Sequence, residues 1–383
     1  MNFNSIEILS LITWFQLCLL AFVLIVYKKG KRSGNLLLAG FLFANSILPA
    51  HHFIILFNLF PAYCNIYIQI FGSAAYSLLL PLLYLYILSL CDSSFRLKPT
   101  HLLHSLTYVF IVLFSLIVFH LTQKSAADTF LYLYGDNFRI KCFYFVIHIQ
   151  IAAYLFLIFK KLIEYNKIIK ENYSFTEKIN LSWLLILLFG FTAMWFINLL
   201  QWLTGILGIH LGEANYMLTL IAVFINLLFA LTISYKSIEQ SNYLSGIAVP
   251  RRYINSSLTP VDCKNIIDKL TAKMEEEKIY IKPALTLEDL SASVGIPARH
   301  ISQSVKVILK SNFYDFINKY RVEEFKRRLI EESSQHLSFI ALAYESGFSS
   351  KSVFNSAFKK YVGITPKEYW NSTVKKQDKT ITS

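Results

Sequence analysis

Two groups of polar side chains recur at helical spacing in the C-terminal part of the chain. They are Arg299, Ser302, Gln303 and Lys306 in the first group, and Lys351, Ser352, Asn355, Ser356 and Lys359 in the second. Steps of three and four residues put such a group on one face of a helix. Arginine pairs with the O6 and N7 atoms of guanine, and glutamine pairs with N6 and N7 of adenine, so these faces could contact base edges. The alternative is the solvated polar face that any surface helix has.

Further lysines lie close to the second group. Lys359, Lys360 and Lys367 are predicted to contact phosphate, which positions a protein on DNA without reading its sequence. The formal net charge of +13 also favours an anionic partner.

Each polar group lies on the second helix of a helix–glycine–helix segment. In the first segment, Thr286 caps a short helix that Gly295 ends, and Pro297 opens the next helix. In the second, Gly347 ends a short helix and Ser349 is predicted to cap the next. This plan is typical of the helix-turn-helix, whose second helix fits the major groove of DNA.

The sequences of these segments resemble one known family. GFSSKSVFNSAFKKYVGITPKEYW, at residues 347–370, closely resembles the signature of the AraC/XylS family of bacterial transcription regulators. LTLEDLSASVGIPARHISQSVK, at 285–306, resembles the first motif of that family, and FYDFINKYRVEEFKRRL resembles its linker helix. The resemblance implies two helix-turn-helix motifs, 287–309 and 338–361, that read adjacent major-groove segments of one promoter. A hydrophobic multi-helix N-terminus fused to this module also resembles a membrane-embedded subgroup of the family.

The N-terminal part has a different composition. The whole chain of 383 residues is 55% hydrophobic and only 16% charged. Residues 1–240 hold 15 Lys and Arg and 9 Asp and Glu, whereas the shorter remainder holds 22 and 15. A purely soluble protein is therefore not expected, because soluble domains are about a quarter charged.

Seven apolar runs in this part approach the roughly 20 residues that cross a bilayer. They are residues 6–27, 36–57, 66–90, 102–121, 143–159, 183–203 and 216–233. The helix of the fifth run is expected to begin near Arg139, and Pro81 could kink the third. Soluble buried helices are the alternative for any one run, but seven together favour lipid.

The basic residues between the runs predict an orientation. Eleven Lys and Arg follow the first, third and fifth runs, against three in the alternate loops. Basic loops stay in the cytoplasm, so the N-terminus is predicted outside and the C-terminal domain in the cytoplasm of a multi-pass cell (inner) membrane protein.

Several polar side chains fall in the outer half of the predicted bundle. They are His51, His52, Gln69, His148, Gln150, Asn198 and Gln201. Polar groups are costly in lipid and tend to face the bundle interior, so together they could line a pocket for a small molecule or ion. The alternative is that they make hydrogen bonds between helices.

The predicted fold class is all-α, a seven-transmembrane-helix bundle followed by a cytoplasmic helical domain with two helix-turn-helix motifs. The predicted parts are a sensor bundle (1–233), a juxtamembrane linker (234–259), a DNA-binding domain (260–372) and a disordered tail (373–383). A helix predicted at 260–278 carries an apolar stripe that packs on the following domain or pairs with a second chain.

The resulting interpretation is a membrane-bound one-component transcription regulator. Its predicted partners are double-stranded promoter DNA, the lipid bilayer, a second copy of the chain and an unidentified small-molecule ligand. The alternative is a transporter or membrane enzyme with an appended DNA-binding reporter module. No nucleophile–base constellation, CxxC pair or metal-ligand spacing is visible in the sequence, so no enzyme activity, cofactor or metal site is predicted.

Overall fold

The computed structural model describes most of the chain. The residues described are 5–27, 30–56, 62–92, 94–122, 138–177, 179–209, 212–244, 258–330 and 337–372. Across these ranges the chain is helical, without a strand and with one isolated β-bridge, between Tyr173 and Thr286. The chain divides into two compact units. Unit 1 comprises Met1–Ile163 and Leu181–Ala248, and unit 2 comprises Glu164–Asn180 and Val249–Ser383.

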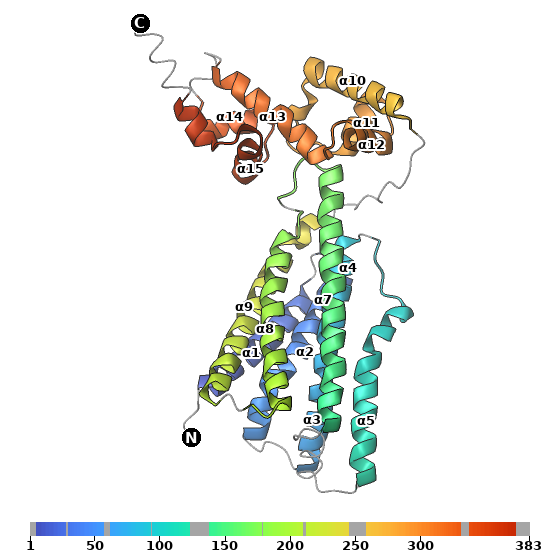
Figure 1. Cartoon of the computed structure of the whole chain (residues 1–383), viewed down its shortest axis with the longest axis vertical. Coiled ribbons are helices and arrows are strands. Elements are labelled where there is room, and N and C mark those ends of the chain that lie inside the picture. Colours follow the sequence, from blue (N-terminus) through green and yellow to red (C-terminus); the bar gives the residue numbers. More distant parts are fainter. Residues whose placement is uncertain are drawn as a thin grey trace. The chain divides into compact units, whose positions relative to one another are not determined.

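Unit 1 is a bundle of long apolar helices (Figure 1). They are α1 (Ser5–Val26), α2 (Arg32–Leu56), α3 (Ala62–Ala75), α4 (Leu79–Cys91), α5 (Leu106–Thr122), α7 (Phe138–Asn172), α8 (Ser182–Ile206) and α9 (Glu213–Leu244), with short 3-10 helices η1 (Tyr76–Leu78) and η2 (Pro99–Ser105). Within the described residues, six segments are long and apolar enough to cross a membrane. The second predicted run lies in α2, which is not among the six, so the number of seven stays a prediction.

The third predicted run is interrupted close to Pro81. The regular helix gives way to η1 between α3 and α4. A proline cannot donate to the carbonyl four residues earlier and its ring crowds that carbonyl, which here is the carbonyl of Ser77. The side-chain Nε2 of Gln150, on α7, donates to Ser77 O at 3.2 Å. A neighbouring helix therefore satisfies the acceptor that the proline leaves free.

The boundaries of two helices refine the sequence predictions. α7 begins at Phe138, close to the predicted start near Arg139, and continues to Asn172. α9 continues to Leu244, so the first part of the predicted linker is helical. The rest of that linker up to residue 257, and the predicted tail 373–383, lie outside the described residues.

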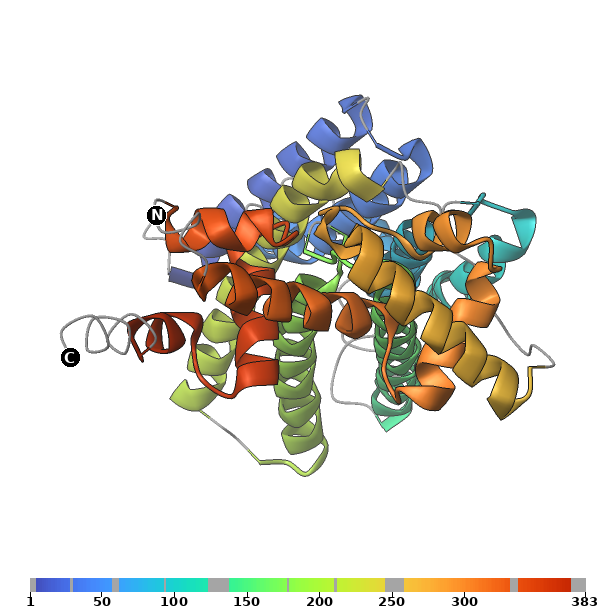
Figure 2. The same cartoon turned by 90° about the horizontal axis from the view of Figure 1, so that it is seen from above.

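Unit 2 consists mainly of short helices around two small cores. They are α10 (Pro260–Glu277), η3 (Ile279–Ile281), α11 (Leu287–Val294), α12 (Ala298–Ile308), α13 (Phe313–Ile330), α14 (Phe339–Glu345) and α15 (Lys351–Val362). Both views show α10–α12 on one side of α13 and α14–α15 on the other (Figure 1 and Figure 2). Phe313 and Ile317 of α13 belong to the first core, and Val322 and Phe325 belong to the second. One helix thus joins the two halves of the unit.

The apolar stripe of α10 packs inside unit 2. Ile267, Leu270 and Met274 are buried in the first core with residues of α11 and α12. Of the two alternatives for this stripe, the structure supports packing on the following domain.

Candidate nucleic-acid interface

The first helix–turn–helix, α11–α12, follows the sequence prediction closely. Thr286 caps α11, because its Oγ1 accepts a hydrogen bond from the backbone nitrogen of Asp289 at 3.1 Å. Gly295 ends α11 with φ 67°, a left-handed conformation that favours glycine. Pro297 precedes α12 and offers no side-chain cap.

The second helix–turn–helix, α14–α15, differs from the prediction by one residue. The predicted cap Ser349 is wrong: the N-cap of α15 is Ser350, whose Oγ accepts from the backbone nitrogen of Val353 at 3.2 Å. Ser350 has the extended backbone that a capping residue needs, with φ −160° and ψ 156°.

Gly347 lies in the turn between α14 and α15, where its backbone packs against the backbone of Tyr280 and Ile281. Its φ is 93°, and a Cβ built there would lie 2.6 Å from Tyr280 O and 2.8 Å from Ile281 Cα. No side chain fits at such distances without displacing backbone. The turn of the second motif is therefore packed directly against η3, which belongs to the first half of unit 2.

The predicted reading face of α12 is partly open. Arg299 and Lys306 are exposed, whereas Ser302 and Gln303 are half-buried. Arg299 Nε donates to Nε2 of the adjacent His300 at 3.2 Å. The structure thus brings these four residues to one helix, with the two charged side chains the more accessible.

The predicted residues of α15 divide between a groove and the open surface. A groove in unit 2 is lined by Phe339, Ile340, Lys351, Asn355, Lys359, Thr365, Pro366, Lys367, Trp370 and Asn371. It collects three of the five predicted residues of α15 together with Lys367. Ser352 and Ser356 are exposed but do not line it. Thr365, Trp370 and Asn371 also line the groove, and the polar face of α15 does not predict them because they follow that helix in the sequence.

Lys360 lies apart from that groove. Its Nζ forms an ion pair with Asp315 Oδ2 at 2.7 Å, so its charge ties α15 to the start of α13. Lys359, the adjacent residue, lines the groove. The two neighbouring lysines therefore have different surroundings, although the sequence predicted phosphate contact for both.

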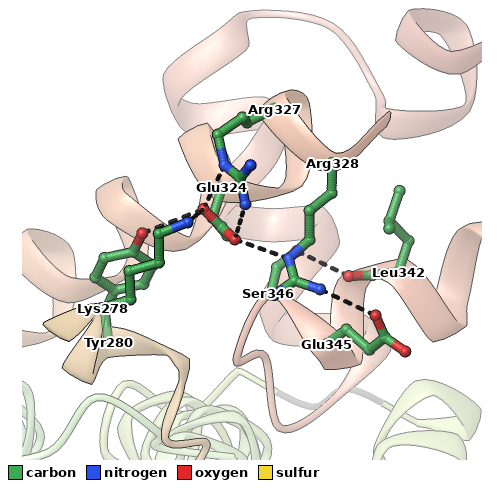
Figure 3. Close-up of polar contacts among 8 residues, drawn as sticks. All are labelled: Lys278, Tyr280, Glu324, Arg327, Arg328, Leu342, Glu345 and Ser346. Carbon is green, nitrogen blue, oxygen red and sulfur yellow. Dashed lines mark hydrogen bonds and ion pairs between the residues drawn. The ribbon is translucent and has the colours of Figure 1, made fainter. Parts of the chain in front are cut away.

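A buried carboxylate holds the two halves of unit 2 together (Figure 3). Glu324 accepts hydrogen bonds from Nε of Arg327 at 2.9 Å and Nε of Arg328 at 2.8 Å, and from the hydroxyl of Tyr280 at 3.2 Å. Arg328 also donates to Glu345 of α14 at 3.0 Å. Burial alone would raise the pKa of Glu324, but these hydrogen bonds and the nearby cations outweigh it and lower the pKa to about 2.

The same environment affects Tyr280. Burial, and then the charge of Glu324, raise the pKa of its hydroxyl to about 12, so Tyr280 remains a neutral donor at physiological pH. The role of Glu324 cannot be predicted from the sequence, because an acidic residue in a charged helix carries no sign that it is buried, and the role of Tyr280 depends on Glu324.

The polar residues predicted in the bundle are only partly described. The side chains of His51, His52 and Gln69 lie outside the described residues. Of the other four, His148 accepts a hydrogen bond from Trp195 at 3.1 Å, and Gln150 donates to Ser77 O at 3.2 Å. Asn198 donates to Met194 O at 2.9 Å, and Gln201 donates to Asn215 Oδ1 at 2.7 Å. These are contacts within and between helices.

The described residues contain no group of three or more His, Cys, Asp or Glu that could hold a metal ion.

Comparison with protein families gives one match. Residues 290–372 match the model of a helix-turn-helix domain of the AraC type. The match supports an AraC/XylS-type DNA-binding domain in this stretch. The match supports a DNA-binding transcription regulator with DNA as a partner. Comparisons with curated proteins and with solved structures find no match.

Proposed function

We propose that the protein is a membrane-bound one-component transcription regulator. It binds promoter DNA sequence-specifically through two helix-turn-helix motifs, α11–α12 and α14–α15, and the bundle of unit 1 senses a signal. One observation carries the DNA-binding part: within the matched stretch, α15 presents Lys351, Asn355 and Lys359 along one face of a capped helix that follows a glycine turn.

The residues divide into two roles. Arg299, Ser302, Gln303 and Lys306 of α12, and Lys351, Ser352, Asn355 and Ser356 of α15, contact the bases. Lys359 and Lys367, together with Lys360 if its ion pair opens, contact phosphate. Regions 260–372 and 1–233 act as the DNA-binding and sensor domains, and two chains side by side bind two sites with increased avidity.

The surface of unit 1 supports a location in the membrane. Large apolar side chains point outward along its helices, such as Phe22, Ile186 and Leu121, which are 63%, 72% and 78% exposed. Lipid is a solvent in which such side chains carry no penalty. A signal molecule would bind among the outer-half polar residues of the bundle, and would act by favouring one of two bundle states.

The orientation that the basic loops predict is compatible with the contacts of unit 1. Lys31 Nζ, in the turn after α1, donates to the carbonyl oxygen of Asp92, after α4, at 2.8 Å. The loops after the first and third predicted runs thus meet at one end of the bundle. Both are basic, so this end is the cytoplasmic one in our proposal.

The proposal is tested with the full chain in lipid nanodiscs. Selection from a random duplex library at low salt should enrich one sequence, and N355A and Q303A should each weaken its binding and relax the preference at one position, at a cost of about 1–3 kcal/mol. K326A is the control, because Lys326 pairs with Glu323 on the surface of α13. A library that shows no enrichment would contradict the proposal.

A further inference from the structure

The chain enters unit 2 twice. Residues 164–180, which comprise the end of α7 and the loop after it, group with the C-terminal residues from 249 onward, although the rest of the intervening chain belongs to unit 1. Within this stretch, Ser174, Thr176 and Ile179 are buried. We call residues 173–180 the docking segment.

The docking segment attaches to the beginning of the first helix–turn–helix. Both the backbone nitrogen and the Oγ of Ser174 donate to Leu285 O, at 3.1 Å and 2.7 Å. Tyr173 forms the antiparallel bridge with Thr286, which is the residue that caps α11. Main-chain pairing of this kind fixes the register of the segment against the helix start.

The segment also completes the surroundings of a buried arginine on α13. Arg321 is fully buried, and it donates from Nη1 to Ser174 O at 3.2 Å and from Nη2 to Ser174 Oγ at 3.1 Å. Its other hydrogen bonds go to the carbonyl oxygens of Tyr280, Lys282 and Pro283 and to the side chain of Asn318. Asn318 in turn donates to Ser174 O at 3.3 Å.

Arg321 depends on neutral acceptors alone. No ion pair with a carboxylate involves it among the described residues, and burial lowers its pKa to about 9. A buried guanidinium is tolerated only when its donors are satisfied, and loss of one acceptor leaves a desolvated donor without a partner. Ser174 supplies two of the acceptors, so α13 needs the docking segment.

We propose that the docking segment is a second, non-covalent attachment of the DNA-binding unit to the rest of the chain, and the route by which unit 1 controls DNA binding. The regulatory part rests on the proposed function. The regulatory route passes through α13, because this helix contributes to both cores of unit 2. A displacement of Ser174 acts on Arg321 in the middle of α13, and α13 sets how the two recognition helices lie relative to each other.

The attachment is tested by cutting the covalent connection. A protease site is introduced at residues 245–257 of the full chain in membrane vesicles, the site is cleaved, and the vesicles are washed in about 1 M salt, where charge attraction is screened beyond about 3 Å. The C-terminal piece is then measured in the supernatant. We expect the unsubstituted piece to sediment with the vesicles.

Substitutions of one segment separate docking from other causes of retention. S174R puts a second cation against Arg321 and should release the piece. S174A removes only the hydroxyl, which donates to Leu285 O and accepts from Arg321 Nη2. The loss of the hydrogen bond to the charged arginine alone should raise the released fraction about tenfold, and the loss of the bond to Leu285 should add to that. E177R is the matched control, because Glu177 is exposed in the same segment and the new arginine meets solvent.

The outcomes distinguish this proposal from the function on which it rests. Release of the unsubstituted piece, or equal retention of the S174R piece, would overturn the docking. Binding of a selected duplex by the uncut chain is measured in parallel. The regulatory route is supported if S174A binds DNA more weakly than the unsubstituted chain while E177R binds as strongly as the unsubstituted chain. If S174A binds DNA as strongly as the unsubstituted chain, the regulatory route is overturned. Absence of any DNA binding, with the piece still attached, contradicts the proposed function alone.

Discussion

Two glycines with the same role in the sequence have different surroundings in the structure. Gly295 and Gly347 each end the first helix of a motif with a positive φ, of 67° and 93°. Nothing lies within 4 Å of a Cβ built at Gly295, whereas backbone atoms of Tyr280 and Ile281 lie under 3 Å from one built at Gly347. The sequence predicts both turns, but the close contact at Gly347 depends on Tyr280 and Ile281, which lie far away in the chain.

We therefore expect unequal effects of the same substitution. G295A should lower the free energy of unfolding of unit 2 by about 1–2 kcal/mol, the cost of a left-handed alanine. G347A should cost about 2–5 kcal/mol, because backbone must also move away from the new methyl group. Thermal unfolding of the full chain in detergent measures both. Equal losses would show that η3 does not press on Gly347.

Glu324 predicts a dependence of stability on pH. Its pKa is about 2 in the folded chain, below the ordinary value of 4.5. A carboxyl whose pKa is lowered on folding stabilises the fold above the unfolded value and loses that effect as the pH falls toward the folded value. The unfolding temperature of E324Q should thus lie below that of the unsubstituted chain at pH 7, and the difference should shrink below about pH 4.5.

The neighbouring carboxylate provides the control for this experiment. Glu323 pairs with Lys326 at 2.8 Å, and its side chain is 57% exposed. Exposed pairs of this kind contribute about 0–1 kcal/mol, so E323Q should change the unfolding temperature little at either pH. An unfolding-temperature difference for E324Q that stays constant as the pH falls would mean that Glu324 does not titrate as its contacts imply.

At the scale of helices, the periodicity of apolar residues predicts most elements. It does not predict features that are formed by contacts between segments far apart in the sequence. The cap Thr286 and the terminating Gly295 of α11 follow from local chemistry, and so does the interruption before Pro81. The docking segment could not be predicted, because Ser174 and Arg321 lie 147 positions apart and neither belongs to an apolar pattern. The groove beside α15 could not be predicted from the periodicity of that helix, because it also needs Phe339 and Ile340 of α14 and residues 365–371, which follow α15.

Two adjacent lysines of α15 test which face of the helix meets DNA. Lys359 lines the groove, and Lys360 pairs with Asp315. K359A should weaken binding to all duplexes and reduce the slope of log affinity against log salt by about one. K360A should leave that slope nearly unchanged, because its charge is already paired within the protein. The measurement is fluorescence anisotropy over a series of salt concentrations, and a larger slope change for K360A would reverse the assignment.

At the scale of the whole chain, composition divides the molecule as the contacts do, with one exception. The segregation of charge predicts an apolar part and a water-soluble part, and units 1 and 2 follow that division. The exception is residues 164–180, the end of α7 and the loop after it, which continue a predicted membrane span in the sequence yet pack with the C-terminal residues of unit 2. Lys167 and Lys170 of this stretch helped to predict the orientation as loop charges, although both belong to α7.

That orientation can be tested at two loop positions with matched exposure. Leu97, in the loop after α4, is 51% exposed, and Ile209, after α8, is 52% exposed. In a cysteine-free background, I209C should react in intact cells with a maleimide that cannot cross the membrane, because its loop carries no lysine or arginine. L97C should react only after the membrane is permeabilised, since basic Arg96 and Lys98 flank it. The reverse pattern would place the helix-turn-helix motifs outside the cell, where there is no promoter for them to bind.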